Sequence, residues 1–150
     1  MALTDAATTG GLPPVLDAAA RRTAFVLPAV RAAVGEARHR VQQQLQEWSI
    51  ASDICDTAVL VVSELFTNGV IHTGSRTITC DLGATPNQLL IQVTDDGTGQ
   101  STPSPRRARP QDVEGRGLML VRAVSQRWGA SPTGAGGGQV VWATLPLAQA

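Results

Sequence analysis

The sequence contains no lysine, and all twelve of its basic residues are arginines. The absence of lysine excludes a Schiff-base lysine, a lysine general base and the phosphate-binding lysine of a P-loop. Twelve acidic residues balance the arginines, so the formal net charge is zero. A chain without net charge has no overall electrostatic attraction to nucleic acid or anionic lipid, and we expect it to bind neither nucleic acid nor membrane directly.

Cysteine is scarce as well, and Cys55 and Cys80 are the two thiols of the chain. They have neither CxxC spacing nor a cluster of histidines nearby, which argues against a zinc site and against a disulfide scaffold. No apolar run approaches the roughly 20 residues that span a bilayer. These absences favour a soluble, cytoplasmic protein, and 150 residues fit a single domain.

The first half of the chain predicts one short strand and two helices. Residues 1–20 are small and weakly polar and are expected to form a flexible tail. A strand over 23–27 is followed by Pro28, which suits the first turn of a helix, and apolar residues then recur every three or four positions as far as Trp48. Asp53 is a candidate N-cap for a second helix. The apolar stripe of this second helix consists of Ile54, Ala58, Val61, Leu65 and Gly69.

Alternating apolar residues then predict two antiparallel strands over 77–82 and 89–93, joined by a turn at 85–87. The stretch 100–114 is rich in serine, proline and arginine and has too few large apolar residues to form an element of its own. It is therefore expected to be a mobile loop.

A third helix is predicted over 118–128, stopped by Gly129, and a last strand over 139–145. The apolar positions of this helix are Leu118, Val121, Val124 and Trp128. The order of the elements predicts a two-layer α/β sandwich with helices packed on one face of a sheet. The domain is expected to cover 21–147, with a C-terminal tail over 148–150. The three tryptophans and both cysteines are predicted to be packing residues.

Glu64 and Asn68 are four residues apart in the second predicted helix, so their side chains project from one helix face. A carboxylate there can act as a general base, and an amide oxygen is a neutral ligand that suits magnesium. The alternative is a solvated helix face, which the pair in isolation favours.

Two glycine-containing segments follow. Asp95 ends a predicted strand and is followed by Gly97 and Gly99, so the backbone can approach a flat ligand while the carboxylate accepts a hydrogen bond from an exocyclic amine. An ordinary turn is the alternative. Gly115 and Gly117 open the third helix, where exposed backbone N–H groups and the helix dipole favour an anion; the alternative is a flexible hinge.

The order of these segments resembles the GHKL superfamily of ATPases, and within it the stand-alone anti-sigma factor serine/threonine protein kinases, which have a histidine-kinase-like ATPase domain. The likeness runs from about Phe25 to Leu147 and rests on three motifs. They are Ser63-Glu64-Leu65-x-x-Asn68-x-x-x-His72, Asp95-x-Gly97-x-Gly99 and Gly115-x-Gly117-Leu118. The resemblance implies an α+β fold of the Bergerat ATP-binding type, with a mixed, mostly antiparallel sheet and helices on one face.

The resemblance also implies ATP and Mg²⁺ as cofactors and a role for each matching position. Asn68 would coordinate Mg²⁺, and Glu64 would activate the hydroxyl or water that attacks the γ-phosphate. Asp95 would accept from the exocyclic amine of adenine, beside Gly97 and Gly99. The lid over the nucleotide would be 100–114. The residues whose backbone would wrap the phosphates are Gly115, Arg116, Gly117 and Leu118.

The sequence departs from the family pattern at two positions. Relatives often carry a threonine in a Gly-Gly-Thr-Val approach to the last strand, where its hydroxyl supports the adenine-reading aspartate, whereas Gln139 stands at that position in this chain. Gly69 replaces the alanine common after the asparagine, and glycine inside a helix costs roughly 0.5–1 kcal/mol relative to alanine. His72 has a family counterpart, but a structural role at the C-terminus of the helix fits it better.

The activity implied by the resemblance is that of an ATP-binding regulator. It would sequester a sigma factor, phosphorylate a serine or threonine of an anti-anti-sigma antagonist, and form a homodimer. The alternative is a catalytically inactive, nucleotide-dependent binding module that holds a sigma factor or another regulator. A fragment of a sensor histidine kinase is a third reading, disfavoured because the chain offers no membrane segment and no separate phosphoacceptor helix.

Overall fold

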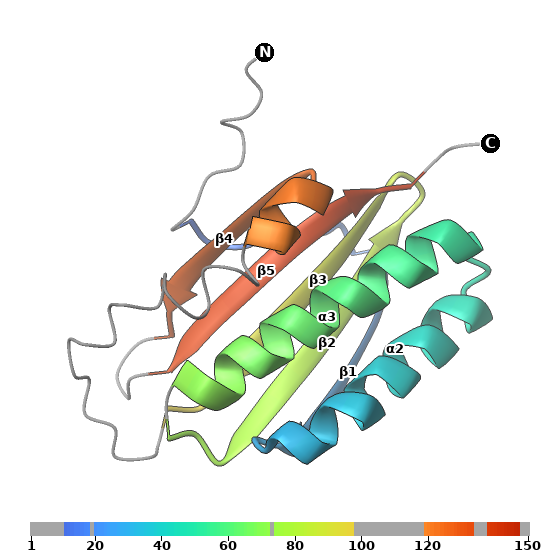
Figure 1. Cartoon of the computed structure of the whole chain (residues 1–150). Coiled ribbons are helices and arrows are strands. Elements are labelled where there is room, and N and C mark those ends of the chain that lie inside the picture. Colours follow the sequence, from blue (N-terminus) through green and yellow to red (C-terminus); the bar gives the residue numbers. More distant parts are fainter. Residues whose placement is uncertain (1–10, 19, 73, 98–118, 134–137, 148–150) are drawn as a thin grey trace.

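The computed structural model describes residues 11–18, 20–72, 74–97, 119–133 and 138–147. Two layers are visible in Figure 1, a sheet and a pair of long helices that lie across one of its faces. Within the described residues the sheet is five-stranded in the order β1-β2-β3-β5-β4, and each neighbouring pair is antiparallel. The strands are β1 (Arg21–Pro28), β2 (Thr77–Thr85), β3 (Gln88–Asp95), β4 (Arg127–Pro132) and β5 (Gln139–Pro146). The predicted α+β sandwich with helices on one face is confirmed.

The first helical segment begins later than the sequence predicts. Pro28 is the last residue of β1 and pairs with Thr77, and the Ala29 N–H still donates to the Arg76 carbonyl at 3.0 Å. The short 3₁₀ helix η1 (Arg31–Ala33) and then α2 (Val34–Glu47) follow. Proline suits the end of an edge strand as well as a first helical turn, and Pro28 belongs to the strand. The predicted stripe of α2 is confirmed, since Ala37, Val41 and Leu45 are fully buried.

α3 (Ser52–His72) is the central helix of the core. Its predicted stripe is confirmed, because Ala58, Val61 and Leu65 are fully buried in the main apolar cluster with side chains of the sheet. By length and composition α3 is apolar enough to cross a membrane, but core helices pass the same test, and its packing assigns it to the core. Asp53 lies in the first turn of α3 rather than before it. The Ala51 carbonyl there accepts from the N–H groups of Ile54 and Cys55.

β2 and β3 form the predicted hairpin. Thr85 pairs with Gln88 at its closed end, and Thr85 Oγ1 accepts from the Gln88 N–H at 3.1 Å. Ile78 pairs with Asp95 at its open end. The alternation seen in the sequence therefore sets both the register of the hairpin and the position of Asp95.

The predicted third helix is wrong in its second half. Residues 119–124 are helical, but Arg127–Pro132 forms the edge strand β4, joined to β5 by the Gln126 N–H, which donates to the Thr144 carbonyl at 2.8 Å. Gly129 does not stop a helix. A Cβ at this position would lie 2.8 Å from Cζ2 of the Trp142 ring, so the glycine gives the indole room to lie on β4.

Both cysteines and all three tryptophans pack as predicted. Burial raises the pKa of the Cys55 thiol and raises that of Cys80 to about 12, so both thiols stay protonated at neutral pH. Trp48 packs against the edge of the main core and Trp128 lies within it. Trp142 belongs to a separate cluster with Leu16 and Leu90.

Two glycine substitutions test this packing. Gly129→Ala is expected to lower the free energy of unfolding by about 1–3 kcal/mol, because its Cβ would press into the Trp142 ring. Gly35→Ala in α2 is the matched control, since no atom lies within 4 Å of its Cβ position. It is expected to raise the free energy of unfolding by about 0.4–1 kcal/mol. Chemical denaturation measures both, and a Gly129→Ala variant as stable as wild type would contradict the placement of the indole.

Candidate functional site

Asp95 is the last residue of β3, the middle strand of the sheet, and its side chain is only 3% exposed. Ser75, in the connection from α3 to β2, donates its hydroxyl to Asp95 Oδ1 at 3.1 Å. The Gly97 N–H donates to the same Ser75 oxygen at 2.8 Å. One hydroxyl therefore ties the buried carboxylate to the backbone that follows it.

The neighbours of Asp95 shift the pKa of its carboxyl in opposite directions. Burial raises the pKa of its carboxyl above the usual 3.8, and the charge on Asp96 acts in the same direction. The hydrogen bond from Ser75 lowers the pKa, and so do the backbone N–H groups of Gln139 and Gly97. Asp95 is thus a buried acceptor whose ionised form depends on donors from two sequence-distant segments.

Asp96 has a different role from its neighbour. Its Oδ1 accepts from the Arg76 N–H at 3.0 Å, and its Oδ2 accepts from the N–H and the hydroxyl of Thr77 at 3.3 and 3.1 Å. These bonds fasten the start of β2 to the end of β3. The sequence allowed Asp95-Asp96-Gly97 to be an ordinary turn. Asp96 has that structural role, whereas the Asp95 carboxylate is buried in the protein.

Two glycines keep the backbone around Asp95 clear of side chains. Gly97 has a φ of 57°, in the left-handed region that other residues rarely adopt. A Cβ at Gly138, just before β5, would lie 2.5 Å from the Asp95 carbonyl oxygen and 2.7 Å from Thr133 Oγ1. A side chain at Gly97 would be strained by this backbone conformation, and none fits at Gly138 without displacing the end of β3.

α3 meets the end of β3 at Gly69. A Cβ there would lie 3.1 Å from Ile78 Cδ1 and 3.9 Å from Asp95 Cβ, so the helix packs directly beside the carboxylate. Asn68, the preceding residue, is 7% exposed, and Glu64 is half-buried one turn earlier. The structure thus brings the segment that carries Glu64 and Asn68 to the same end of the sheet as Asp95.

The remaining predicted site residues lie outside the described part of the chain. This holds for the expected lid, 100–114, and for the side chain of His72. It holds also for Gly99, Gly115, Arg116, Gly117 and Leu118.

Ser75 is the residue that sequence reasoning missed. It stands where the hydrophobic pattern changes from helical to strand spacing, and a serine in such a connection is ordinary. Its partners Asp95 and Gly97 are 20 and 22 positions away. Ser75 supplies a hydroxyl to Asp95 from the β2 side, and Gln139, at the start of β5, contributes its backbone N–H from the other side.

The residues present fit a magnesium-bound adenine nucleotide. A buried carboxylate followed two residues later by a glycine suits a flat base that carries an amino group. Among the described residues no group of three or more His, Cys, Asp and Glu could hold a metal ion on its own. Magnesium bound to phosphates keeps several waters and needs only one or two protein oxygens, and the Asn68 amide oxygen would be one such ligand.

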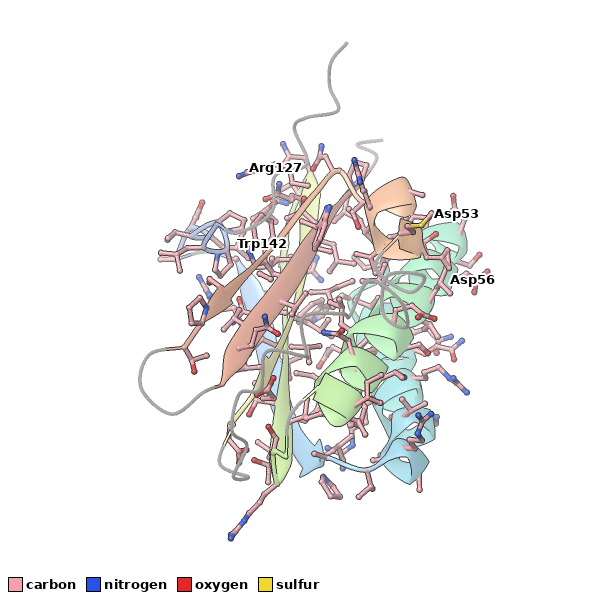
Figure 2. All side chains as sticks on the ribbon, turned by 60° about the vertical axis from the view of Figure 1, so that its left-hand side comes forward. Asp53, Asp56, Arg127 and Trp142 are labelled. Carbon is pink, nitrogen blue, oxygen red and sulfur yellow. The ribbon has the colours of Figure 1, made fainter. Side chains whose placement is uncertain are left out.

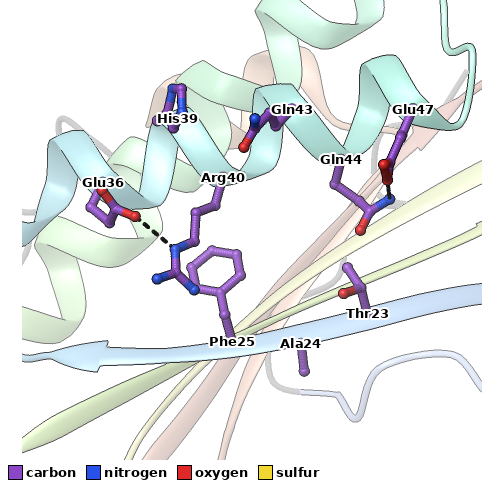
Figure 3. A pocket seen from close by; sticks show the side chains of 9 residues that line it. All are labelled: Thr23, Ala24, Phe25, Glu36, His39, Arg40, Gln43, Gln44 and Glu47. Carbon is purple, nitrogen blue, oxygen red and sulfur yellow. Dashed lines mark hydrogen bonds and ion pairs between the residues drawn. The ribbon is translucent and has the colours of Figure 1, made fainter.

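A separate groove of about 630 Å³ lies between β1 and α2 (Figure 3). Arg40 crosses it, 5.3 Å from the centre of the Phe25 ring, and forms a 2.8 Å ion pair with Glu36. Neither Asn68 nor Asp95 lines this groove. Its polar walls from α2 mark it as a different surface from the Asp95 site.

The fold is that of an α+β domain with a buried carboxylate at the end of the middle strand of its sheet. The family model of the histidine kinase-like ATPase domain matches residues 27–145, and the chain belongs to that family. This membership assigns ATP binding to the domain.

Solved structures support the same fold. The crystal structure of the RsbU and RsbW domains of Rv1364c from Mycobacterium tuberculosis is similar, with a TM-score of 0.60 and 18% sequence identity. The similarity covers 87% of this chain and 33% of that chain, so this chain spans about a third of its length. At this identity the likeness shows the fold alone. No curated protein sequence matches this chain significantly.

The Ser75 bridge can be tested without a ligand. Ser75→Ala removes a donor to the ionised carboxylate, so the pKa of Asp95 is expected to rise further. Ser75→Thr retains the hydroxyl and is the matched control. NMR titration of the Asp95 carboxyl carbon measures the change, and identical titration curves for Ser75→Ala and wild type would show that the bridge is absent in solution.

Proposed function

We propose that this protein is a cytoplasmic, ATP- and Mg²⁺-dependent anti-sigma factor that phosphorylates a serine or threonine of an anti-anti-sigma antagonist. The observation that carries the proposal is the buried Asp95 carboxylate, held by Ser75 and packed against the helix that bears Glu64 and Asn68. The motif likeness to anti-sigma factor kinases and the fold likeness to a structure that contains an RsbW domain support it.

The adenine end of the site depends on Asp95. Its ionised carboxylate accepts a hydrogen bond from the exocyclic amine of the base, and Ser75 positions that carboxylate as an acceptor. Gly97 follows two residues later with a φ of 57° and no Cβ, which would let the base approach the end of the sheet. This is recognition of one edge of a flat ring, and it selects adenine over bases that present an acceptor there.

The phosphate end depends on α3. Asn68 offers an amide oxygen to Mg²⁺, which when bound neutralises negative charge on the phosphates. Glu64 accepts the proton from the attacking serine or threonine hydroxyl of the antagonist. Gly115 and Gly117 supply backbone N–H groups to the phosphates. Phosphoryl transfer needs mainly positioning and charge neutralisation, so a site without lysine is sufficient.

The partners follow from the same proposal. The protein sequesters a sigma factor, phosphorylates the antagonist protein and works as a homodimer. The catalytically inactive binding module remains the alternative. Gln139 and the proline- and arginine-rich composition of 100–114 are the two features in its favour. The Ser75 hydroxyl on Asp95 favours intact adenine recognition instead.

Asp95→Asn is expected to weaken ATP binding by about 1–3 kcal/mol, because an amide can turn an N–H₂ group toward the adenine amine. Since the pKa of Asp95 is raised, wild-type affinity should fall on acidification at a higher pH than for an ordinary aspartate, and this component should vanish in Asp95→Asn. Titration calorimetry with ATP and Mg²⁺ measures both effects.

Asp81→Asn is the matched control for that experiment. Asp81 is also a partly buried aspartate with a pKa raised by burial. It lies on β2, however, among residues of the sheet face that is turned away from the helices. It should bind ATP as wild type does. Equal affinities for Asp95→Asn and Asp81→Asn would remove Asp95 from adenine recognition.

Glu64→Ala is expected to abolish phosphate transfer from labelled ATP to the cognate antagonist while leaving ATP affinity within about twofold, since the carboxylate acts on the attacking hydroxyl rather than on the nucleotide. Glu47→Gln, at the end of α2, is the control and should transfer at the wild-type rate. Transfer by Glu64→Ala at the wild-type rate would exclude Glu64 as the base. Tight ATP binding by the wild type without any transfer would instead favour the inactive module.

A further inference from the structure

The face of the sheet opposite the helices carries a small apolar cluster of its own. Leu90 and Trp142 lie there on β3 and β5, and Leu16, from the segment before β1, packs on them with only 7% of its surface exposed. Figure 2 shows Trp142 on the side of the sheet away from the helices, with Arg127 above it. Residues 11–18, expected from the sequence to belong to a flexible tail, are called the strap from here on.

The sheet is shaped to receive the leucine of the strap. A Cβ at Gly83 would collide with Leu16 Cδ1, so the missing side chain leaves a hollow in β2 that this methyl group fills. A cavity of about 300 Å³ around the hollow is lined by Leu16, Gly83, Leu90 and residues of β1 and β2. The glycine and Leu90 together make a socket for one branched aliphatic side chain.

The backbone of the strap is held by side-chain donors of the sheet. Trp142 Nε1 donates to the Gly11 carbonyl at 2.9 Å. Arg22 Nη2 donates to the Leu16 carbonyl at 2.9 Å and to the Asp17 carbonyl at 3.4 Å. The Arg127 guanidinium lies 5.6 Å from the centre of the Trp142 ring and covers the indole.

These contacts match the needs of a segment with two prolines. Pro13 and Pro14 lack an N–H, and residues 11–17 form neither helix nor strand. Such a segment presents carbonyl oxygens, and the donors on this face are directed at carbonyl oxygens. An aromatic surface with side-chain donors is how proteins bind extended, proline-containing peptides.

We propose that this sheet face is a binding site for an extended, proline-containing peptide with a leucine anchor, and that the strap occupies it as an intramolecular ligand. The strap is held by one buried side chain and three carbonyl oxygens, while Leu12 and Val15 are 74% and 95% exposed. Such an attachment is reversible, so a partner segment of the same chemistry can take its place. The site is separate from Asp95 and does not depend on ATP binding.

The first test follows the indole of Trp142 in the full chain labelled with 5-fluorotryptophan. Its ¹⁹F resonance is assigned by its loss in Trp142→Phe. Leu16→Gln is expected to shift this resonance and leave those of Trp48 and Trp128 in place, because Leu16 lies outside the main core. Leu12→Gln, a matched change at an exposed strap position, should shift none. An unmoved Trp142 resonance in Leu16→Gln would overturn the proposal.

The second test supplies the ligand from outside. A synthetic peptide with the sequence of residues 11–18, added to the Leu16→Gln chain, is expected to return the Trp142 resonance to its wild-type position with saturation. The same peptide with glutamine at its second leucine, the position of Leu16, should bind at least tenfold more weakly, since it lacks the buried anchor. Equal binding of the two peptides would overturn the proposal.

Gly83→Val fills the socket with a side chain from β2. This variant tests the proposal independently if Leu16→Gln does not fold. Valine suits a strand, and its side chain would occupy the space of Leu16 Cδ1. This variant is expected to show the shifted Trp142 resonance and not to respond to the peptide. A wild-type resonance in Gly83→Val would count against the proposal.

Discussion

The hydrogen bonds that connect Gly97, Ser75 and Asp95 are the interaction on which the site depends. A carboxylate that is 3% exposed is stable only when donors replace the water that it has lost. Here the donors come from the connection before β2, from the backbone after β3 and from the start of β5. The ends of three neighbouring strands therefore converge on one side chain, and Asp96 secures the same junction by binding the backbone of Arg76 and Thr77.

The sheet serves a different purpose on each face. Toward the helices, side chains of β2, β3 and β5 build the main core, and α3 rests on it so that Gly69 touches the end of β3. On the opposite face, Leu90 and Trp142 hold the strap. β5 connects the Asp95 site with the strap. The backbone N–H of Gln139 at its start donates to Asp95, and Trp142 near its middle donates to the Gly11 carbonyl.

Much of this arrangement could be predicted from the sequence because it is encoded locally. Alternation set the β2–β3 hairpin, helical spacing set the buried faces of α2 and α3, and the position of Asp95 at a strand end followed from the hairpin. β4 was missed because Val121, Val124 and Trp128 keep helical spacing across a real helix and into a strand. The sequence predicted that Gly129 ends a helix, but in the structure its missing side chain leaves room for the Trp142 ring. Ser75 and the strap were missed because their partners are distant in sequence, and no local pattern encodes such contacts.

Gly69 sets the spacing between the helical layer and the sheet at the end where the site lies. With a Cβ position only 3.1 Å from Ile78 Cδ1, the helix sits about as close to β2 as an isoleucine allows. An alanine at 69 requires Ile78 Cδ1 to move by a few tenths of an ångström, and a larger residue requires a smaller side chain at 78 or an outward shift of α3. In related chains these two positions should therefore covary, a residue larger than alanine at 69 accompanying valine or smaller at 78, so that the distance from the helix to the carboxylate is conserved even where neither residue is.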